Sequence, residues 1–218
     1  DKFGDARRTA ILDELGEFRV EDLIADDVMV VTVSNQGYIK SLPIDTYRKQ
    51  RRGGKGVAGM ETKEEDFVKD LFTASAHQYM LFFTTRGRLH WRKVHELPRG
   101  GRTAKGRAIV NLLSLGEGER VTACLPVRDL NEEGRFVFMV TRKGTVKKTA
   151  LKAFSNPRAT GIIALDLDKD DELWEAQLTS GHDNILIATR NGLAIRFPET
   201  DVRPMGRNAR GVIGIRLK

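Results

Sequence analysis

The 218-residue sequence has a single cysteine and no hydrophobic run long enough to cross a membrane. Because Cys124 is alone, it cannot form an internal disulfide or a cysteine-based zinc cluster. Its apolar neighbours predict a buried thiol, which suits a reducing cytoplasm. The longest apolar runs, such as 28–31, have the length of a strand, whereas a spanning helix needs about 20 residues. Residues 1–14 lack the apolar core of a secretion signal, so we expect no secretion signal. We also expect no membrane among the partners.

Acidic side chains are in the minority. The sequence has 37 Lys and Arg against 30 Asp and Glu, which gives a formal net charge of +7. This excess favours an acidic partner, with nucleic acid first and an anionic membrane surface second. Because 40% of the residues are hydrophobic, the chain can form a sizeable core, and global disorder is not expected.

A repeat of about 50 residues runs through the chain. Each copy has a Ser or Thr three residues before a glycine, and the glycine lies between two short runs rich in β-branched and apolar residues. This pattern predicts a β-hairpin whose turn requires a positive backbone φ at the glycine. The pairs are Ser34 and Gly37, Thr84 and Gly87, Thr141 and Gly144, and Thr189 and Gly192.

A second glycine follows the first by 17 to 19 residues in each copy and precedes a further strand-like run. These glycines are Gly56, Gly106, Gly161 and Gly211. A final strand, for example 120–123 or 173–176, closes the unit, so one unit has about four short strands, as in a propeller blade. We therefore predict one all-β domain over 1–218, a propeller-like disc of four-stranded antiparallel blades. Its repeats are expected at about 18–79, 80–135, 136–184 and 185–218, the last one incomplete, so that this chain alone would not close a ring.

Basic residues gather before the second glycine, and acidic residues such as Asp168 gather one strand later. A strand of about five residues would place the two groups at opposite ends of a blade, about 17 Å apart. Neighbouring blades would then collect the basic loops on one rim, where cations can hold the phosphates of bent duplex DNA without reading its sequence. The expected DNA contacts in these loops are Arg48, Lys49, Arg99, Arg102, Lys105, Arg107, Arg158, Arg203, Arg207 and Arg210.

The first of these loops is the richest. It contains Gln50, Arg51, Arg52, Gly53, Gly54, Lys55 and Gly56, with three cations and no acid. The glycines let the backbone come close to a phosphate. The spacing of a nucleotide-binding P-loop is missing. We expect this loop to bind DNA and to determine where the DNA wrap ends.

Few residues suggest catalysis or metal binding. Tyr47 lies three residues before the glycine-rich loop, and we expect it to be a packing anchor rather than a nucleophile. The acidic stretch 166–172 lacks the glycine and the final glutamate of an EF-hand loop, so a solvated turn is expected. His90 and His95 match no ligand pattern and are expected in strands. We predict no catalytic residue and no metal site, which disfavours a nuclease or hydrolase.

The sequence QRRGGKG at 50–56 resembles the box that marks the C-terminal domain of the DNA gyrase A subunit. The flanking segments that share the resemblance are 3–11, 21–40, 64–72, 107–113, 144–151 and 211–217. The resemblance implies a six-bladed β-pinwheel whose blades exchange strands, with about four of the blades in this chain. It also implies a non-catalytic domain that chirally wraps duplex DNA, so that gyrase introduces negative supercoils using ATP.

The resemblance further implies how the domain fits into the enzyme. Residues 1–17 would be a linker from the cleavage domain, which carries the catalytic tyrosine. The domain would bind no cofactor, whereas the whole enzyme uses ATP and Mg. Its partners would be double-stranded DNA with little sequence preference, the rest of the gyrase A subunit, and the gyrase B subunit. Two alternatives stay open. One is a topoisomerase IV-type C-terminal domain that steers DNA substrate choice, and the other is a propeller-type protein-interaction platform.

Overall fold

The computed structural model describes residues 20–47, 59–62 and 65–217. The strands are β1 (Val28–Ser34), β2 (Tyr38–Pro43), β3 (Val68–Ser75), β4 (Tyr79–Thr84), β5 (Arg88–Lys93), β6 (Arg107–Ala108), β7 (Val121–Val127), β8 (Phe136–Thr141), β9 (Thr145–Ala150), β10 (Ile162–Ile163), β11 (Leu173–Thr179), β12 (Asn184–Ala188), β13 (Ala194–Pro198) and β14 (Val212–Ile213). The short 3-10 helices are η1 (Val20–Leu23), η2 (Ile44–Thr46), η3 (Val94–Glu96), η4 (Ile109–Asn111), η5 (Leu151–Phe154) and η6 (Glu199–Asp201). Within these described ranges, none of the helices has the length and apolarity to span a bilayer.

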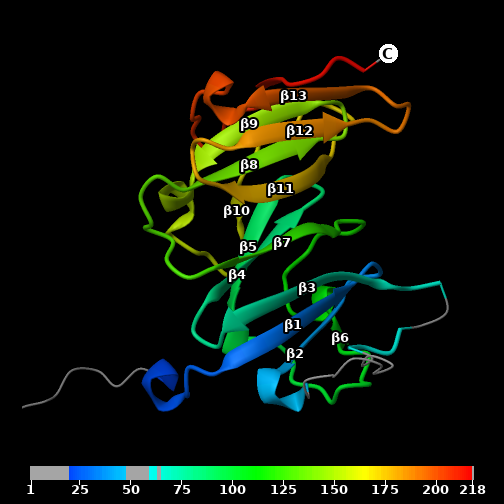
Figure 1. Cartoon of the computed structure of the whole chain (residues 1–218), viewed down its shortest axis with the longest axis vertical. Helices are drawn as coiled ribbons and strands as arrows, with labels where there is room; N and C mark the ends of the chain where they lie inside the picture. The colour runs from blue at the N-terminus through cyan, green and yellow to red at the C-terminus, as the bar shows by residue number, and fades with distance from the viewer. Residues whose placement is uncertain (1–19, 48–58, 63–64, 218) are drawn as a thin grey trace, which may run out of the picture.

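Within the described residues, the strands form three four-stranded antiparallel sheets and one two-stranded sheet. Their orders are β3-β1-β2-β6, β10-β5-β4-β7, β11-β8-β9-β14 and β12-β13. The sheets follow one another along the long axis of the molecule, from β1–β3 at one end to β12 and β13 at the other (Figure 1). This arrangement confirms the predicted all-β fold with four-stranded antiparallel blades.

Each predicted hairpin is present, and its turn explains the Ser/Thr-to-Gly spacing. The turn glycines have φ values of +83°, +68°, +86° and +82° at Gly37, Gly87, Gly144 and Gly192. The amide of each glycine donates to the carbonyl oxygen of the Ser or Thr three residues earlier, at 2.9 to 3.1 Å. The hydroxyl oxygen of that Ser or Thr accepts the amide of the residue after the glycine, at 3.0 to 3.2 Å. The motif therefore closes its own turn with local hydrogen bonds.

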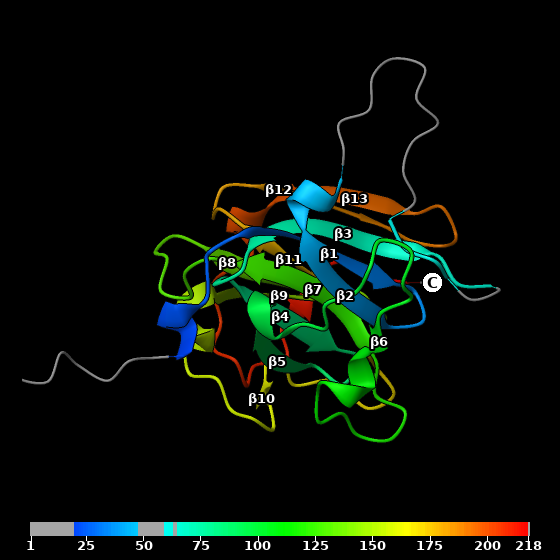
Figure 2. The same cartoon turned by 90° about the horizontal axis from the view of Figure 1, so that it is seen from below.

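The strand after the second glycine differs from the prediction. It is only two residues long, and it pairs with the hairpin of the preceding unit: β6 with β2, β10 with β5, and β14 with β9. The four short strands of one unit therefore belong to two neighbouring blades, which is the exchange of strands that the family resemblance implies. The glycine explains why, because Gly106 has a φ of +79° and a Cβ there would lie 2.4 Å from the carbonyl oxygen of Ile39. The chain thus packs backbone against backbone on the neighbouring blade, as the exchange of strands requires (Figure 2).

The core lies between successive blades. Met80 and Phe82 of β4 face the cluster shared with the first sheet, and Leu81 and Phe83 face the cluster shared with the third sheet. Both faces of this strand are therefore buried, as the unbroken apolar run of β4 indicates. Cys124 packs in the first of these clusters, and burial raises the pKa of its thiol. The predicted buried cysteine is confirmed.

Candidate nucleic-acid interface

The loop richest in cations and glycine, 50–56, lies outside the described residues, as do Arg48 and Lys49. Its predicted anchor, Tyr47, is described. Tyr47 is the C-terminal cap of η2, and its half-buried side chain donates a hydrogen bond of 3.4 Å from its hydroxyl to the carbonyl oxygen of Gly59. Tyr47 therefore contacts Gly59, the residue that follows segment 48–58 in the sequence, as expected for a packing residue.

The other basic loops recur at the edge of a hairpin in successive blades. Loop 98–106 runs beside β2, where the Ser41 amide donates to the carbonyl oxygen of Pro98 at 2.8 Å and a β-bridge joins Ser41 to Arg99. Loop 203–211 runs beside β9, where a β-bridge joins Lys148 to Pro204. Loop 155–161 precedes β10 in the same way, although no such bridge is present between β5 and this loop in the described chain.

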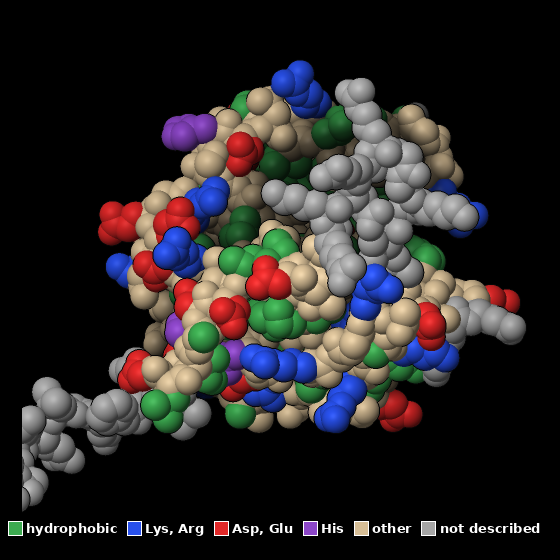
Figure 3. All heavy atoms as spheres, turned by 60° about the horizontal axis from the view of Figure 1, so that its bottom comes forward, with side chains coloured by type: hydrophobic (Ala, Val, Ile, Leu, Met, Phe, Trp, Pro, Cys, Tyr) green, Lys and Arg blue, Asp and Glu red, His purple; other side chains and the backbone are tan. Residues whose placement is uncertain are grey.

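Nearly all of the predicted cations in these three loops are exposed. Arg99, Arg102, Lys105, Arg158, Arg203 and Arg210 are exposed, and Arg207 is half-buried. Arg107, which follows the first of these loops in β6, is also exposed. Figure 3 shows Lys and Arg side chains gathered along the lower part of one face, with Asp and Glu side chains among them. The loops can therefore offer their charges to a ligand without rearrangement of the core.

The predicted separation of basic and acidic loops is wrong at one place. Arg210 pairs with Asp166 at 3.4 Å through Nε and with Asp168 at 3.1 Å through a terminal nitrogen. Because the strand between the loops, β10, has two residues rather than five, the acidic turn of one unit returns beside the basic loop of the next. Exposed pairs of this kind contribute little to stability, but they neutralise part of the charge on this loop.

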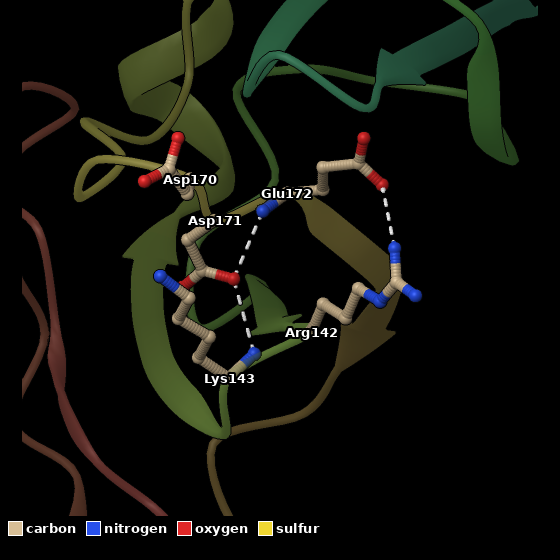
Figure 4. Close-up of a pocket in the computed structure, with 5 residues that line it drawn as sticks. All are labelled: Arg142, Lys143, Asp170, Asp171 and Glu172. Carbon is tan, nitrogen blue, oxygen red and sulfur yellow. Dashed lines mark hydrogen bonds and ion pairs between the residues drawn. The ribbon is translucent and has the colours of Figure 1, made fainter.

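The acidic turns have a structural task. The Asp171 carboxylate accepts the amides of Lys143 and Glu172 at 3.0 and 2.9 Å (Figure 4). The Lys143 ammonium also donates to the carbonyl oxygen of Lys169 at 2.8 Å. A cleft of about 390 Å³ lies between this turn and the β8–β9 hairpin.

The first blade repeats this arrangement. Asp66 accepts the amides of Gln36 and Phe67, both at 2.9 Å. These carboxylates therefore hold hairpin turns in place. In the part of the chain that is described, no group of three or more His, Cys, Asp or Glu side chains could hold a metal ion.

Buried lysines are functional candidates that the sequence alone did not single out. Lys40 and Lys147 are both 0% exposed and occupy the third position after a hairpin glycine. The Lys40 ammonium donates to the carbonyl oxygens of Gly101 and Arg102 at 2.9 and 2.6 Å. The Lys147 ammonium donates to those of Ala164 and Arg207 at 2.8 and 2.5 Å. No sequence signal separates these lysines from surface cations, since β9 reads TVKKTA with two adjacent lysines.

Burial changes the acid–base behaviour of both lysines. Burial lowers the pKa of Lys40, and the negative charge of the nearby Glu61 partly opposes this decrease. Burial also lowers the pKa of Lys147 to about 8, an effect that the Asp166 carboxylate opposes and the Arg207 guanidinium reinforces. A buried ammonium is tolerated because carbonyl oxygens replace its water shell.

His90 occupies the same repeat position in the second blade. It lies in β5, as predicted, whereas His95 lies in η3 rather than in a strand. Burial lowers the pKa of His90, and its Nε2 has no hydrogen-bond partner among the described residues. A cavity of about 130 Å³ beside it is lined also by Pro157 and Arg158 of the loop.

Comparison with known proteins places this arrangement in a family. The family model described as "DNA gyrase C-terminal domain, beta-propeller" matches residues 29–75, 78–128, 135–173 and 183–218. The DNA gyrase A subunit of Salmonella typhimurium is 52% identical over 217 residues, which is all of this chain and 25% of that protein. Those of Escherichia coli K12 and Clostridium acetobutylicum are 48% and 47% identical over 99% and 98% of this chain. The chain spans about a quarter of the length of these relatives.

Solved structures share the fold. The C-terminal domain of DNA topoisomerase IV has a TM-score of 0.76 at 29% identity, covering 89% of this chain and 59% of that one. The DNA gyrase A C-terminal domain has a TM-score of 0.67 at 23% identity, covering 88% of this chain and 61% of that one. Since the family model matches four successive segments that make up most of the sequence, the chain belongs to the DNA gyrase C-terminal domain family of β-propellers.

Proposed function

We propose that this chain is the DNA-binding and DNA-wrapping domain of a gyrase A subunit. In this role it bends duplex DNA around its basic rim, so that the whole enzyme can introduce negative supercoils using ATP. The observation that carries the proposal is the placement of exposed Arg and Lys side chains on equivalent loops of successive blades. A single basic loop would be compatible with a solvated surface, whereas a series of them suits a polyanion.

The physical argument rests on the charge of duplex DNA. DNA carries one negative charge about every 1.7 Å of its axis, and cations that neutralise phosphates release bound counterions. Bending 20 to 30 base pairs costs on the order of 1 to 6 kcal/mol, so contacts must continue along the bend. Loops 98–106, 155–161 and 203–211 supply such a continuing set. Because their contacts would go to phosphates, little sequence preference is expected.

Residues 48–56 belong to the same proposal. Arg48, Lys49 and the seven residues from Gln50 to Gly56 would form a fourth loop of the series, and we propose that it determines where the wrap ends. The domain would act with the rest of the gyrase A subunit and with the gyrase B subunit in the cytoplasm. Residues 1–17 would link it to the cleavage domain. ATP and Mg would act in other parts of the enzyme, and the domain itself would contribute no catalytic residue.

A topoisomerase IV-type role is less well supported. Relatives named as the A subunit of DNA gyrase are 47% to 52% identical over nearly the whole chain, and the QRRGGKG box is intact. A protein-interaction platform would differ in a simple way, because its binding would be insensitive to salt. Binding to DNA titrated at two salt concentrations separates this platform from a DNA-wrapping domain.

The test is the topology of a relaxed plasmid closed by ligase in the presence of the full chain. Wrapping would shift the linking number, and the sign of the shift would give the handedness. The matched variant replaces Arg51, Arg52 and Lys55 with alanine and should lose the shift. Absence of any shift with the unaltered chain at saturating binding would refute wrapping.

A second test uses the whole enzyme. In gyrase that carries the same triple substitution, negative supercoiling should be lost while relaxation or decatenation survives. Persistent supercoiling would show that the box is not the wrapping determinant. This outcome would leave the other basic loops as the candidates.

A further inference from the structure

Two of the basic loops are fastened to the blade beneath them by a buried ammonium group. Lys40 reaches from β2 to loop 98–106, and Lys147 reaches from β9 to loop 203–211. Arg102 and Arg207, whose carbonyl oxygens accept these bonds, both lie four residues before the second glycine of their unit. The contact is therefore a repeated feature rather than a coincidence of one loop.

These lysines are not explained by ion pairing. Among the described residues, no carboxylate lies within ion-pair distance of either ammonium nitrogen, unlike Lys148, which pairs with Glu199 at 3.8 Å. Removing an ammonium from water is costly unless polar groups replace the water. The carbonyl oxygens that do so belong mainly to the basic loops, so the favourable contacts depend on where those loops lie.

The loop packs closely over the lysine side chain. A Cβ at Gly106 would lie 3.2 Å from Cβ of Lys40, and a Cβ at Gly100 would lie 3.6 Å from its Cδ. The loop therefore passes over the aliphatic part of Lys40 and is bonded to its tip. Both contacts restrict the backbone that carries Arg99 and Arg102.

The second blade provides the internal comparison. His90 replaces the lysine, its Nε2 has no hydrogen-bond partner among the described residues, and it lines a cavity of about 130 Å³ together with Pro157 and Arg158. The loop above it has one cation, Arg158, where the other two have at least three each. Arg88 of β5 donates to the carbonyl oxygen of Thr160 at 2.6 Å, so this loop is bonded to its hairpin by a guanidinium group near the surface rather than by a buried ammonium.

We propose that Lys40 and Lys147 are positioning residues for DNA binding, which fix the backbone of loops 98–106 and 203–211 so that their cations meet successive phosphates. This inference rests on the proposed function. Neither ammonium reaches the ligand, because both are fully buried. Their effect is to keep the exposed cations of a loop in register with one another.

The experiment measures the affinity of the full chain for a duplex as a function of salt. Each phosphate contact contributes about 0.9 to the slope of log K against log salt. Lys40→Met should lower the slope by about 2 to 3 and the affinity at least about tenfold, since several cations lose their alignment together. Lys105→Met, which removes one exposed cation of the same loop, should lower the slope by about 1.

Controls separate positioning from charge and from folding. Lys169→Met removes one charge from an exposed acidic turn and should leave the slope unchanged. A double-mutant cycle should show that Arg102→Ala costs less affinity in the Lys40→Met background, whereas Arg207→Ala costs the same there. Lys147→Met should give the reverse pattern. Circular dichroism and urea unfolding would establish that each variant is folded.

Each outcome decides the question. Additive effects in both cycles, or slopes that fall by no more than 1, would overturn the positioning role while leaving DNA binding intact. Loss of the folded state in both methionine variants would assign the lysines to the core and would equally overturn it. If the unaltered chain does not bind the duplex, the proposed function itself fails.

Discussion

The loops over Lys40 and Lys147 and the loop over His90 occupy the same place in successive blades, yet they are held differently. The first two are bonded through a buried ammonium group, and the third lies beside a cavity. The blade is compatible with either arrangement, because the hairpin and the exchanged strand are the same in all three blades. The fold therefore supplies a position for the loop, whereas the side chain that bonds to the loop differs between blades: a buried lysine in two of them, and Arg88 in the third.

The largest expected effect distinguishes the two kinds of loop through their second glycine. Gly106→Ala places a Cβ against a carbonyl oxygen at 2.4 Å in a backbone with positive φ, so we expect a loss of about 3 kcal/mol or more in unfolding free energy. Gly161→Ala meets the His90 ring at 2.7 Å, and that ring can turn into the cavity, so the expected loss is about 1 to 2 kcal/mol. Urea unfolding measures both, with Gly101→Ala, which meets no atom within 4 Å, as the control. Equal losses would contradict the difference between the loops.

A second prediction concerns Lys147 and alkaline pH. Its pKa is lowered to about 8 in the folded chain from 10.5, so between these pH values the unfolded chain binds a proton that the folded chain does not. Stability should therefore rise with pH in this window, by about 3 kcal/mol at most. Lys147→Met should lack this rise. A parallel pH dependence in both proteins would show that the lysine titrates normally.

Among single exposed cations, we expect unequal effects on DNA binding. Arg102→Ala should lower the salt slope by about 1, because Lys40 holds the backbone of Arg102 in place. Arg158→Ala should lower it by less, since its loop has no bond from a buried lysine and is bonded to the hairpin by Arg88 near the surface. Filter binding at several salt concentrations gives both slopes. A larger effect at Arg158 would reverse the comparison.

The smallest expected effect concerns His90 and mild acid. Burial holds its pKa below the usual 6.5, and Glu119 opposes this while Arg88 and Arg92 reinforce it. As the pH falls below about 6.5, the unfolded chain takes up a proton before the folded chain does, so stability falls. His90→Gln should be less sensitive to pH in this range. Urea unfolding at about pH 5.5 and about pH 7.5 tests this, and unchanged sensitivity would exclude His90 as the cause.

The parts of the fold that could be predicted depend on local chemistry. The Ser/Thr and glycine of each hairpin bond to one another within five residues, so their spacing is visible in the sequence. The partner of β6 is not visible, because two residues carry no pattern that identifies a strand far earlier in the chain. Likewise, Lys40 and Lys147 resemble ordinary surface cations until the loop above them is in place. The described rim cations other than Arg207 are exposed, as a basic loop rich in glycine and proline suggests, but the contact of Arg210 with Asp168 depended on the length of β10.

The exchange of strands has a consequence for the order in which the protein is made. The first sheet is complete only when β6, at Arg107–Ala108, reaches the edge of β2, which ends at Pro43. At a synthesis rate of about 5 to 20 residues per second, that edge is open for several seconds on the ribosome. The later blades have the same delay, because each waits for a strand of the next unit. A nascent chain therefore always carries one hairpin whose outer strand edge is still unpaired. Assembly of the domain is therefore directional, and each blade is completed by its successor.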